Sequence, residues 1–250
     1  MTETGTRRDP PGTLRPAFYA AHPGGWRDWW TVLHPPYTAW HLGYVVIGAC
    51  LAPQVHTDRL VATVVAFFLA VGVAAHALDE VHGRPLETGI PTRWLLAAAA
   101  LALGGAVGLG VLGVGRVGPA LVPFVVVGPL LVVGYNLDVA PLHKDLLFAA
   151  SWGAFPVLTG CVAQTGRLSW AAGAAGAGAL TLSMAQRSLS TPARLLRRRS
   201  LGVTGRIEMV EGPDRALDRA TLLEPLERAL HLLAASVVLL AAALALARLT

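Results

Sequence analysis

The chain has 250 residues, of which 54% are apolar and 14% are charged, with a formal net charge of +5 and a mean hydropathy of +0.55. Soluble domains usually carry about 25% charged residues, so this composition excludes an ordinary soluble globular protein. The basic balance suits anionic lipid headgroups, and we expect the partner of this chain to be the membrane lipid bilayer and not nucleic acid.

Seven apolar windows follow one another along the chain. Most of them reach the roughly 17–25 residues that a helix needs to cross a hydrocarbon core. Lipid offers the backbone no hydrogen-bond partners, so repeated spans of this type must be helical. The windows are Tyr37–Ala52, Leu60–Leu78, Trp94–Val114, Val117–Leu137, Leu146–Ala163, Leu168–Ala185 and Leu230–Ala247. The predicted fold is therefore an all-α, polytopic transmembrane helical bundle with about seven or more membrane helices.

The chain divides into a short amino-terminal part and a membrane domain. Residues 1–33 are expected to form a cytoplasmic arm and an interfacial segment, because they contain no long apolar run. Residues 34–250 form the predicted transmembrane helical domain. Within it, residues 186–229 are predicted to form an Arg-rich cytoplasmic loop between the last two spans.

The distribution of lysine and arginine predicts the orientation. With the amino terminus in the cytoplasm, sixteen of the twenty basic residues fall on the inner side of the membrane and four on the outer side. Cytoplasmic loops carry such an excess of Lys and Arg. We therefore expect a multi-pass protein of the cell membrane with a cytoplasmic amino terminus.

The Arg-rich loop has its own pattern. Thr191 suits the N-cap of a helix that starts there, and Arg194, Arg197 and Arg198 then share one face of it. Residues 214–228 predict a second, mixed-charge helix on the membrane surface. The arginines suit phosphate oxygens, which a guanidinium binds in a bidentate way, and they equally suit a positive anchor on the inner side of the membrane.

The stretch VGVAAHALDEVHGRPLETGIP (71–91) places several charged groups at the end of an apolar helix. His76, Asp79 and Glu80 share one helix face because they are three and four residues apart. Two carboxylates at the wet edge of the membrane offer the oxygen ligands that Mg²⁺ prefers. Arg84 follows one turn later. The same residues also fit an ordinary helix end at the level of the lipid headgroups.

Further polar groups are expected on the same side or inside the bundle. Lys144 is the only lysine and suits a diphosphate, although a lone loop charge is the alternative. His41, Gln164 and Gln186 lie within or next to apolar windows, where they either line a pocket or form hydrogen bonds between helices.

Four segments appear in an order that is typical of one membrane-enzyme family. HPPYTAWHLGYVVIGA (34–49) begins the first span, and HALDEVHGRPLETG (76–89) follows the second with acids and then Arg-Pro-Leu. Tyr135 and Lys144 follow the fourth span, and LLFAASWGAFPVLTGCVAQTG (146–166) forms the fifth. Their order resembles that of the UbiA superfamily of membrane prenyltransferases.

The resemblance implies a UbiA-like fold and the transfer of a prenyl group, an alkyl group larger than methyl, from a prenyl diphosphate with the help of Mg²⁺. A histidine would deprotonate the acceptor. The candidate site residues are His76 and His82 for catalysis, Asp79 and Glu80 for Mg²⁺, and Arg84, Lys144, Arg194 and Arg197 for the diphosphate.

The chain also departs from the family pattern. The family's first motif is Asn-x-x-x-Asp-x-x-x-Asp, and in this chain only Glu80 keeps an acid at the matching spacing. The second Asp-rich motif is missing, since residues 183–199 contain no carboxylate. Direct guanidinium contacts are the chemical substitute for the second metal. The alternative is a non-catalytic UbiA-like protein that binds an isoprenoid lipid or a quinone, or that serves as a partner subunit.

Overall fold

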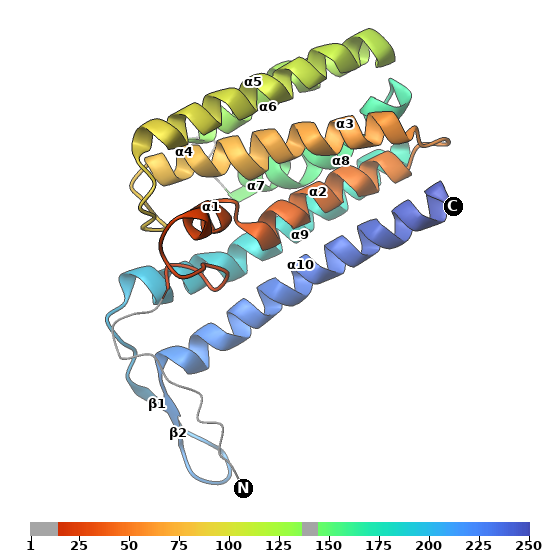
Figure 1. Cartoon of the computed structure of the whole chain (residues 1–250). Helices are drawn as coiled ribbons and strands as arrows, with labels where there is room; N and C mark the ends of the chain where they lie inside the picture. The colour runs from red at the N-terminus through yellow and green to blue at the C-terminus, as the bar shows by residue number, and fades with distance from the viewer. Residues whose placement is uncertain (1–14, 137–144) are drawn as a thin grey trace, which may run out of the picture.

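The computed structural model describes residues 15–136 and 145–250, and over these residues the chain is a mostly helical bundle whose long helices run side by side (Figure 1). Five helices are long and apolar enough to cross a membrane. They are Thr57–Val81, Thr92–Val117, Pro119–Asn136, Asp145–Thr165 and Arg219–Leu249. The prediction of a helical membrane bundle is therefore confirmed in its coarse form. The other two apolar windows also lie in helices, but these do not meet the same criteria.

Sixteen helices, turns and strands follow one another along the described residues. In chain order they are α1 (Trp26–Val32), α2 (Pro35–Cys50), α3 (Thr57–Phe67), the π-helix η1 (Phe68–Ala75), α4 (His76–Val81), α5 (Thr92–Val117), the 3-10 turn η2 (Pro119–Leu121), α6 (Val122–Asn136), α7 (Asp145–Ala149), the π-helix η4 (Ala150–Ala154), α8 (Phe155–Thr165), α9 (Trp170–Arg194), the π-helix η5 (Leu195–Arg199), β1 (Gly205–Ile207), β2 (Arg215–Leu217) and α10 (Arg219–Leu249). The segments α3–η1–α4 and α7–η4–α8 are each one continuous helix.

Helices α2 and α8 pack backbone against backbone through a reciprocal pair of glycines. A Cβ atom on Gly48 would overlap the backbone of Val157, and a Cβ atom on Gly160 would overlap the carbonyl oxygen of Val45. Small residues allow this close approach in membrane bundles, where dispersion contacts drive helix association. The contact holds α2 at the centre of the bundle, next to α10.

The hydrophobic core cluster around α2 contains a buried tyrosine whose hydroxyl is hydrogen-bonded. Trp40 and Tyr44 of α2 are almost fully buried against α8, α9 and α10. The Tyr44 hydroxyl donates a hydrogen bond to the Ala179 carbonyl (3.3 Å) and accepts one from the Ser183 hydroxyl (3.5 Å). Its polar end therefore has partners inside the bundle, as a buried tyrosine requires.

Residues 186–229, which the sequence predicts as a loop, contain regular helix and strand over much of their length. Helix α9 continues through Thr191, so the prediction that Thr191 caps a new helix is wrong. The predicted surface helix over 214–228 is also wrong, because these residues supply strand β2 and the first turns of α10. Strand β1 pairs antiparallel with β2. The hairpin projects from one end of the bundle, which we call the hairpin end, and the carboxyl terminus lies at the opposite end (Figure 1).

The glycine contact predicts the effect of adding one methyl group. Gly160→Ala should lower the free energy of unfolding by about 1–3 kcal/mol, because α2 and α8 must move apart. Gly108→Ala on α5 is the matched control, since nothing lies within 4 Å of its Cβ position. It should be neutral or stabilising by up to about 1 kcal/mol. Thermal unfolding of both variants in the same lipid nanodiscs tests this, and equal midpoints would contradict the contact.

Candidate functional site

A polar cavity of about 270 Å³ lies at the hairpin end of the bundle. Its wall combines residues from distant parts of the chain, including the segment before α1, helices α2, α4, α6 and α9, and the start of α10. The charged and imidazole side chains on it are His34, His41, His76, Asp79, Arg187, Arg194, Arg197, Arg198 and Glu227. Such a concave site with converging polar groups is the usual form of a ligand pocket.

The two candidate metal ligands on α4 have different environments. Asp79 lines the polar cavity. Glu80 is fully buried, and its carboxylate accepts hydrogen bonds from the backbone N–H of Leu86 (2.9 Å) and of Thr88 (2.9 Å) and from the Thr88 hydroxyl (2.8 Å). Both oxygens of Glu80 therefore hold the loop that follows α4, whereas Asp79 accepts no side-chain hydrogen bond within the described ranges.

Arg84 belongs to the same loop and not to the cavity. Its guanidinium donates hydrogen bonds to the carbonyls of Thr88 (3.2 Å) and Ile90 (2.6 Å) and to the Thr92 hydroxyl (2.8 Å). His82 is exposed and does not line the cavity. Lys144 lies outside the described residues, so its place relative to the diphosphate site stays a prediction.

Two of the four cavity arginines are neutralised by ion pairs. Arg197 forms a bidentate pair with Glu227 of α10, with both distances at 2.6 Å. Arg187 pairs with Asp145 at 2.5 Å. Arg194 and Arg198 have no ion pair among residues 15–136 and 145–250.

The positive charges of Arg194 and Arg198 act across the cavity on the Asp79 carboxylate. Two guanidinium groups without an ion pair in the described part of the chain therefore face a single carboxylate in a partly buried site. This leaves an excess of positive charge in the cavity, which an anion would neutralise.

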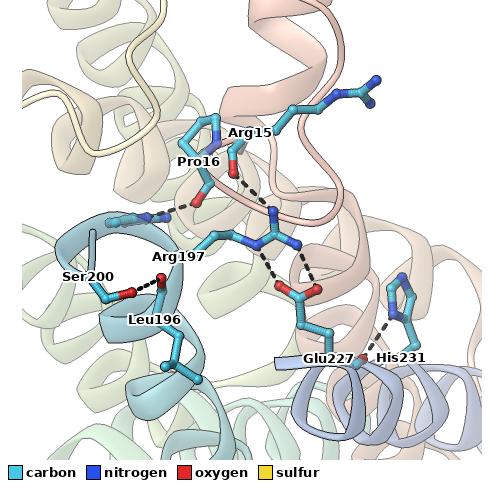
Figure 2. Close-up of polar contacts among 8 residues, drawn as sticks. Arg15, Pro16, Leu196, Arg197, Ser200, Glu227 and His231 are labelled. Carbon is cyan, nitrogen blue, oxygen red and sulfur yellow. Dashed lines mark hydrogen bonds and ion pairs between the residues drawn. The ribbon is translucent and has the colours of Figure 1, made fainter. Parts of the chain in front are cut away.

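An amino-terminal strap, Arg15–Ala20, closes one side of the cavity. Figure 2 shows Arg197 between the Arg15 carbonyl and the Glu227 carboxylate. Arg197 donates to the Arg15 carbonyl (3.1 Å), and Arg198 donates to the Pro16 carbonyl (2.9 Å). The ring of Phe18 packs on His231 of α10, with centroids 4.1 Å apart. The strap thus ties the amino-terminal part to α10 at the mouth of the cavity.

Buried rings lie beside the strap. The imidazoles of His34 and His76 stack with centroids 4.1 Å apart, and Tyr19 lies 5.2 Å from His34. Burial lowers the pKa of His34 well below its usual value, and the neighbouring His76 and Arg198 act in the same direction. Burial likewise raises the pKa of Tyr19 above its usual value. Both groups are therefore neutral at physiological pH.

An apolar groove of about 320 Å³ lies next to the polar cavity and shares two wall residues with it. It lies among α3, α5, α6 and α8, and it extends from the Asp58–Arg116 ion pair at the opposite end of the bundle to Val71 and Trp152. Val71 and Trp152 line the polar cavity as well. The two spaces therefore share Val71 and Trp152 as wall residues, with a charged space on one side and an apolar space on the other.

Three π-helical segments contribute to the polar cavity. Val71 and Ala75 come from η1, Trp152 from η4, and Arg197 and Arg198 from η5. A π-helical turn shifts the rotation of the residues that follow it, and such turns are frequent at functional sites.

Comparisons with known proteins add no family assignment. No protein-family model, no curated protein and no solved structure matches this chain. The cavity itself is therefore the basis for assigning a function.

Sequence reasoning misses His34 and the strap as parts of the site. It already groups Arg198 with Arg194 and Arg197 as arginines that suit phosphate oxygens, and Arg198 lies on the cavity wall. The sequence signal for His34 is its position directly before two prolines. In the structure His34 has a left-handed backbone (φ 47°), and the chain turns there into α2. The strap has no motif, since its contacts are made by backbone carbonyls.

The environments of the two acids predict effects of different size on the free energy of unfolding. Glu80→Gln should lower the free energy of unfolding by about 1.5–3 kcal/mol. The substitution replaces a charged carboxylate oxygen, which accepts a hydrogen bond, with an amide nitrogen, which cannot accept one. Asp79→Asn should change it far less. Thermal unfolding in nanodiscs compares the two variants, and equal losses would contradict the division of roles between these acids.

The lowered pKa of His34 predicts a dependence of stability on pH. The unfolded chain takes up a proton on this histidine near its usual pKa, whereas the folded chain does so only at lower pH. His34 therefore makes its full contribution to the free energy of unfolding above pH about 6.5. This contribution is lost as the pH falls below that value. Thermal midpoints measured from pH 8 to pH 5 should fall less for His34→Gln than for the unchanged protein. Parallel curves would contradict the burial of a neutral His34.

Proposed function

We propose that this chain is a UbiA-like prenyltransferase embedded in the cell membrane, with the polar cavity on the cytoplasmic side. It would bind a prenyl diphosphate with its head group in the cavity and its chain in the apolar groove. The observation that carries the proposal is that the charged cavity and the apolar groove are neighbours, with Val71 and Trp152 in the walls of both. A polar head bound beside Arg194 and Arg198 would have an apolar tail site directly behind it.

Arg194 and Arg198 are the proposed head-group ligands. Charge-assisted hydrogen bonds to phosphate oxygens are roughly twice as strong as neutral ones. The single donor bond of Arg198 to the Pro16 carbonyl leaves its other N–H groups for a ligand. Arg197 is bound to Glu227 on one side, and its role is to position the strap and the neighbouring arginines.

The proposed reaction is substitution at an allylic carbon. The bond between the allylic carbon and the diphosphate oxygen breaks, and the electron pair leaves with pyrophosphate, whose charge the guanidinium groups meet. The acceptor forms a bond to that carbon and loses a proton. His76 is the candidate base, because its Nδ1–H donates to the Gly72 carbonyl (3.3 Å) and leaves Nε2 as the proton acceptor.

Mg²⁺ does not fit the described carboxylates well. No group of three or more His, Cys, Asp or Glu side chains among residues 15–136 and 145–250 is placed to hold a metal. Glu80 uses both oxygens on the loop, so Asp79 alone remains of the two predicted metal ligands. The proposed mechanism therefore assigns neutralisation of the diphosphate to arginine, and Mg²⁺ has no step in it.

The second candidate function is a non-catalytic one, in which the same cavity holds an isoprenoid lipid or a quinone, or the chain acts as a partner subunit. The hydrogen bonds of Glu80 favour it, because they remove an acid that the UbiA superfamily uses for metal-assisted ionisation. Both candidates share the head-group site, and they differ in whether the bond to diphosphate breaks.

Pyrophosphate release distinguishes the two candidates. The protein in nanodiscs, given C10 to C20 prenyl diphosphates with a panel of acceptors, should release pyrophosphate, with and without Mg²⁺. Arg194→Gln should lower the rate at least tenfold, because it removes a charge-assisted contact to the leaving group.

Arg228→Gln is the matched control, since Arg228 lies on α10 and does not line the cavity. It should leave the rate unchanged. Tight binding of the diphosphates without release would favour the non-catalytic candidate. Absence of both binding and release would remove the head-group site altogether.

A further inference from the structure

Helix α1 has an exposed aromatic face that its packing in the bundle does not use. Trp26 and Trp30 are four residues apart on the same face, and they are 71% and 48% exposed. Thr31 and Val32, by contrast, are buried. Indole rings are enriched at the membrane–water interface, where the apolar ring lies against lipid and the N–H stays close to water. The exposed face of α1 therefore suits the headgroup region of a bilayer.

A buried carboxylate holds α1 at the level where two candidate membrane spans end. Asp28 accepts hydrogen bonds from the backbone N–H of Gly24 (2.8 Å) and of Gly89 (3.0 Å). Gly89 belongs to the connection between α4 and α5, which end and begin two of these spans. Helix α1 accordingly lies beside this connection, at the hairpin end (Figure 1). At the start of α5 Arg93 lies over the ring of the exposed Trp94, 5.8 Å from its centroid, so the same level carries a second arginine–tryptophan pair.

A shallow hollow of about 380 Å³ lies between α1 and the chain before it. Its wall consists of Arg15, Ala21, His22, Trp26, Arg27 and Trp30. The guanidinium of Arg27 lies over the Trp26 ring, 5.8 Å from its centroid, and it forms no hydrogen bond or ion pair within residues 15–136 and 145–250. The wall thus brings together two guanidinium groups and two indole rings, and none of its described residues is acidic.

We propose that this hollow binds the phosphate of an anionic phospholipid. Arg15 and Arg27 would donate charge-assisted hydrogen bonds to the phosphate oxygens, and basic groups at a membrane surface attract anionic lipids. Trp26 and Trp30 would contact the glycerol and the first acyl carbons. A free phosphate ion would use the arginines alone and leave both rings exposed to water, so the rings favour the lipid as the occupant. The site is separate from the polar cavity and does not depend on the proposed prenyl transfer.

A comparison of two phospholipids with identical acyl chains tests the site. The full chain in detergent micelles is titrated with phosphatidylglycerol or with phosphatidylcholine, and native mass spectrometry measures the affinity for the first bound lipid. Both lipids carry a phosphate, but the choline ammonium balances its charge. The protein should bind phosphatidylglycerol roughly tenfold more tightly, the effect of one charge-assisted contact.

Two variants tie this preference to the hollow. Arg27→Gln should reduce the preference severalfold and leave the affinity for phosphatidylcholine and the thermal midpoint unchanged, because its guanidinium makes no hydrogen bond in the described part of the chain. Trp26→Ala should weaken the binding of both lipids. Arg228→Gln is the matched control: Arg228 is an exposed arginine of α10 near the same end of the bundle and does not line the hollow. It should keep the full preference.

Equal affinities of the unchanged protein for the two lipids overturn the site. Equal losses of preference in Arg27→Gln and Arg228→Gln overturn it as well, because they indicate a diffuse positive surface. An excess of inorganic phosphate separates the lipid from the free ion. Phosphatidylglycerol that stays bound supports the lipid site, whereas its complete displacement assigns the hollow to a free anion and overturns the proposal. Pyrophosphate release bears on none of these outcomes, so the proposed function and this site fail independently.

Discussion

Guanidinium groups outnumber carboxylates in the polar cavity at the hairpin end of the bundle, and this charge imbalance governs what the site can bind. Arg197 and Arg187 are neutralised by Glu227 and Asp145, but Arg194 and Arg198 face the cavity with Asp79 opposite them. Like charges held together in a partly buried site are unfavourable until an anion joins them. The cavity therefore carries an excess of positive charge before any ligand binds.

Helix geometry determines which acid takes part. Neighbouring residues of an α-helix point about 100° apart, so the two acids on α4 have different surroundings: Glu80 fixes the loop, and Asp79 lines the cavity. The backbone contact between Gly48 and Val157 keeps α2 close to α8, and this places His41 on the cavity wall. The site thus depends on packing far from its own charges.

Much of the fold was predictable from hydropathy, because long apolar runs in lipid have few alternatives to a helix. The position of Asp79 at the end of a span and the gathering of arginines on one side were visible in the sequence too. Other features of the site were not predictable, for physical reasons that differ from residue to residue. Glu80 accepts hydrogen bonds from the backbone N–H groups of Leu86 and Thr88 because the loop after α4 folds back onto it. No local sequence pattern predicts this reversal of the chain. Thr191 has the right chemistry for an N-cap, but α9 is already formed and continues through it, so no free N–H groups need a cap there.

A structure of the protein in nanodiscs with farnesyl thiodiphosphate, a donor analogue that reacts slowly, tests whether the arginines bind the diphosphate. We predict that the two phosphates lie within hydrogen-bond distance of Arg194 and Arg198 and that the farnesyl chain passes Trp152 into the groove between α3, α5 and α8. A head group bound instead at the Asp58–Arg116 end, or an analogue that does not enter the bundle, would contradict it.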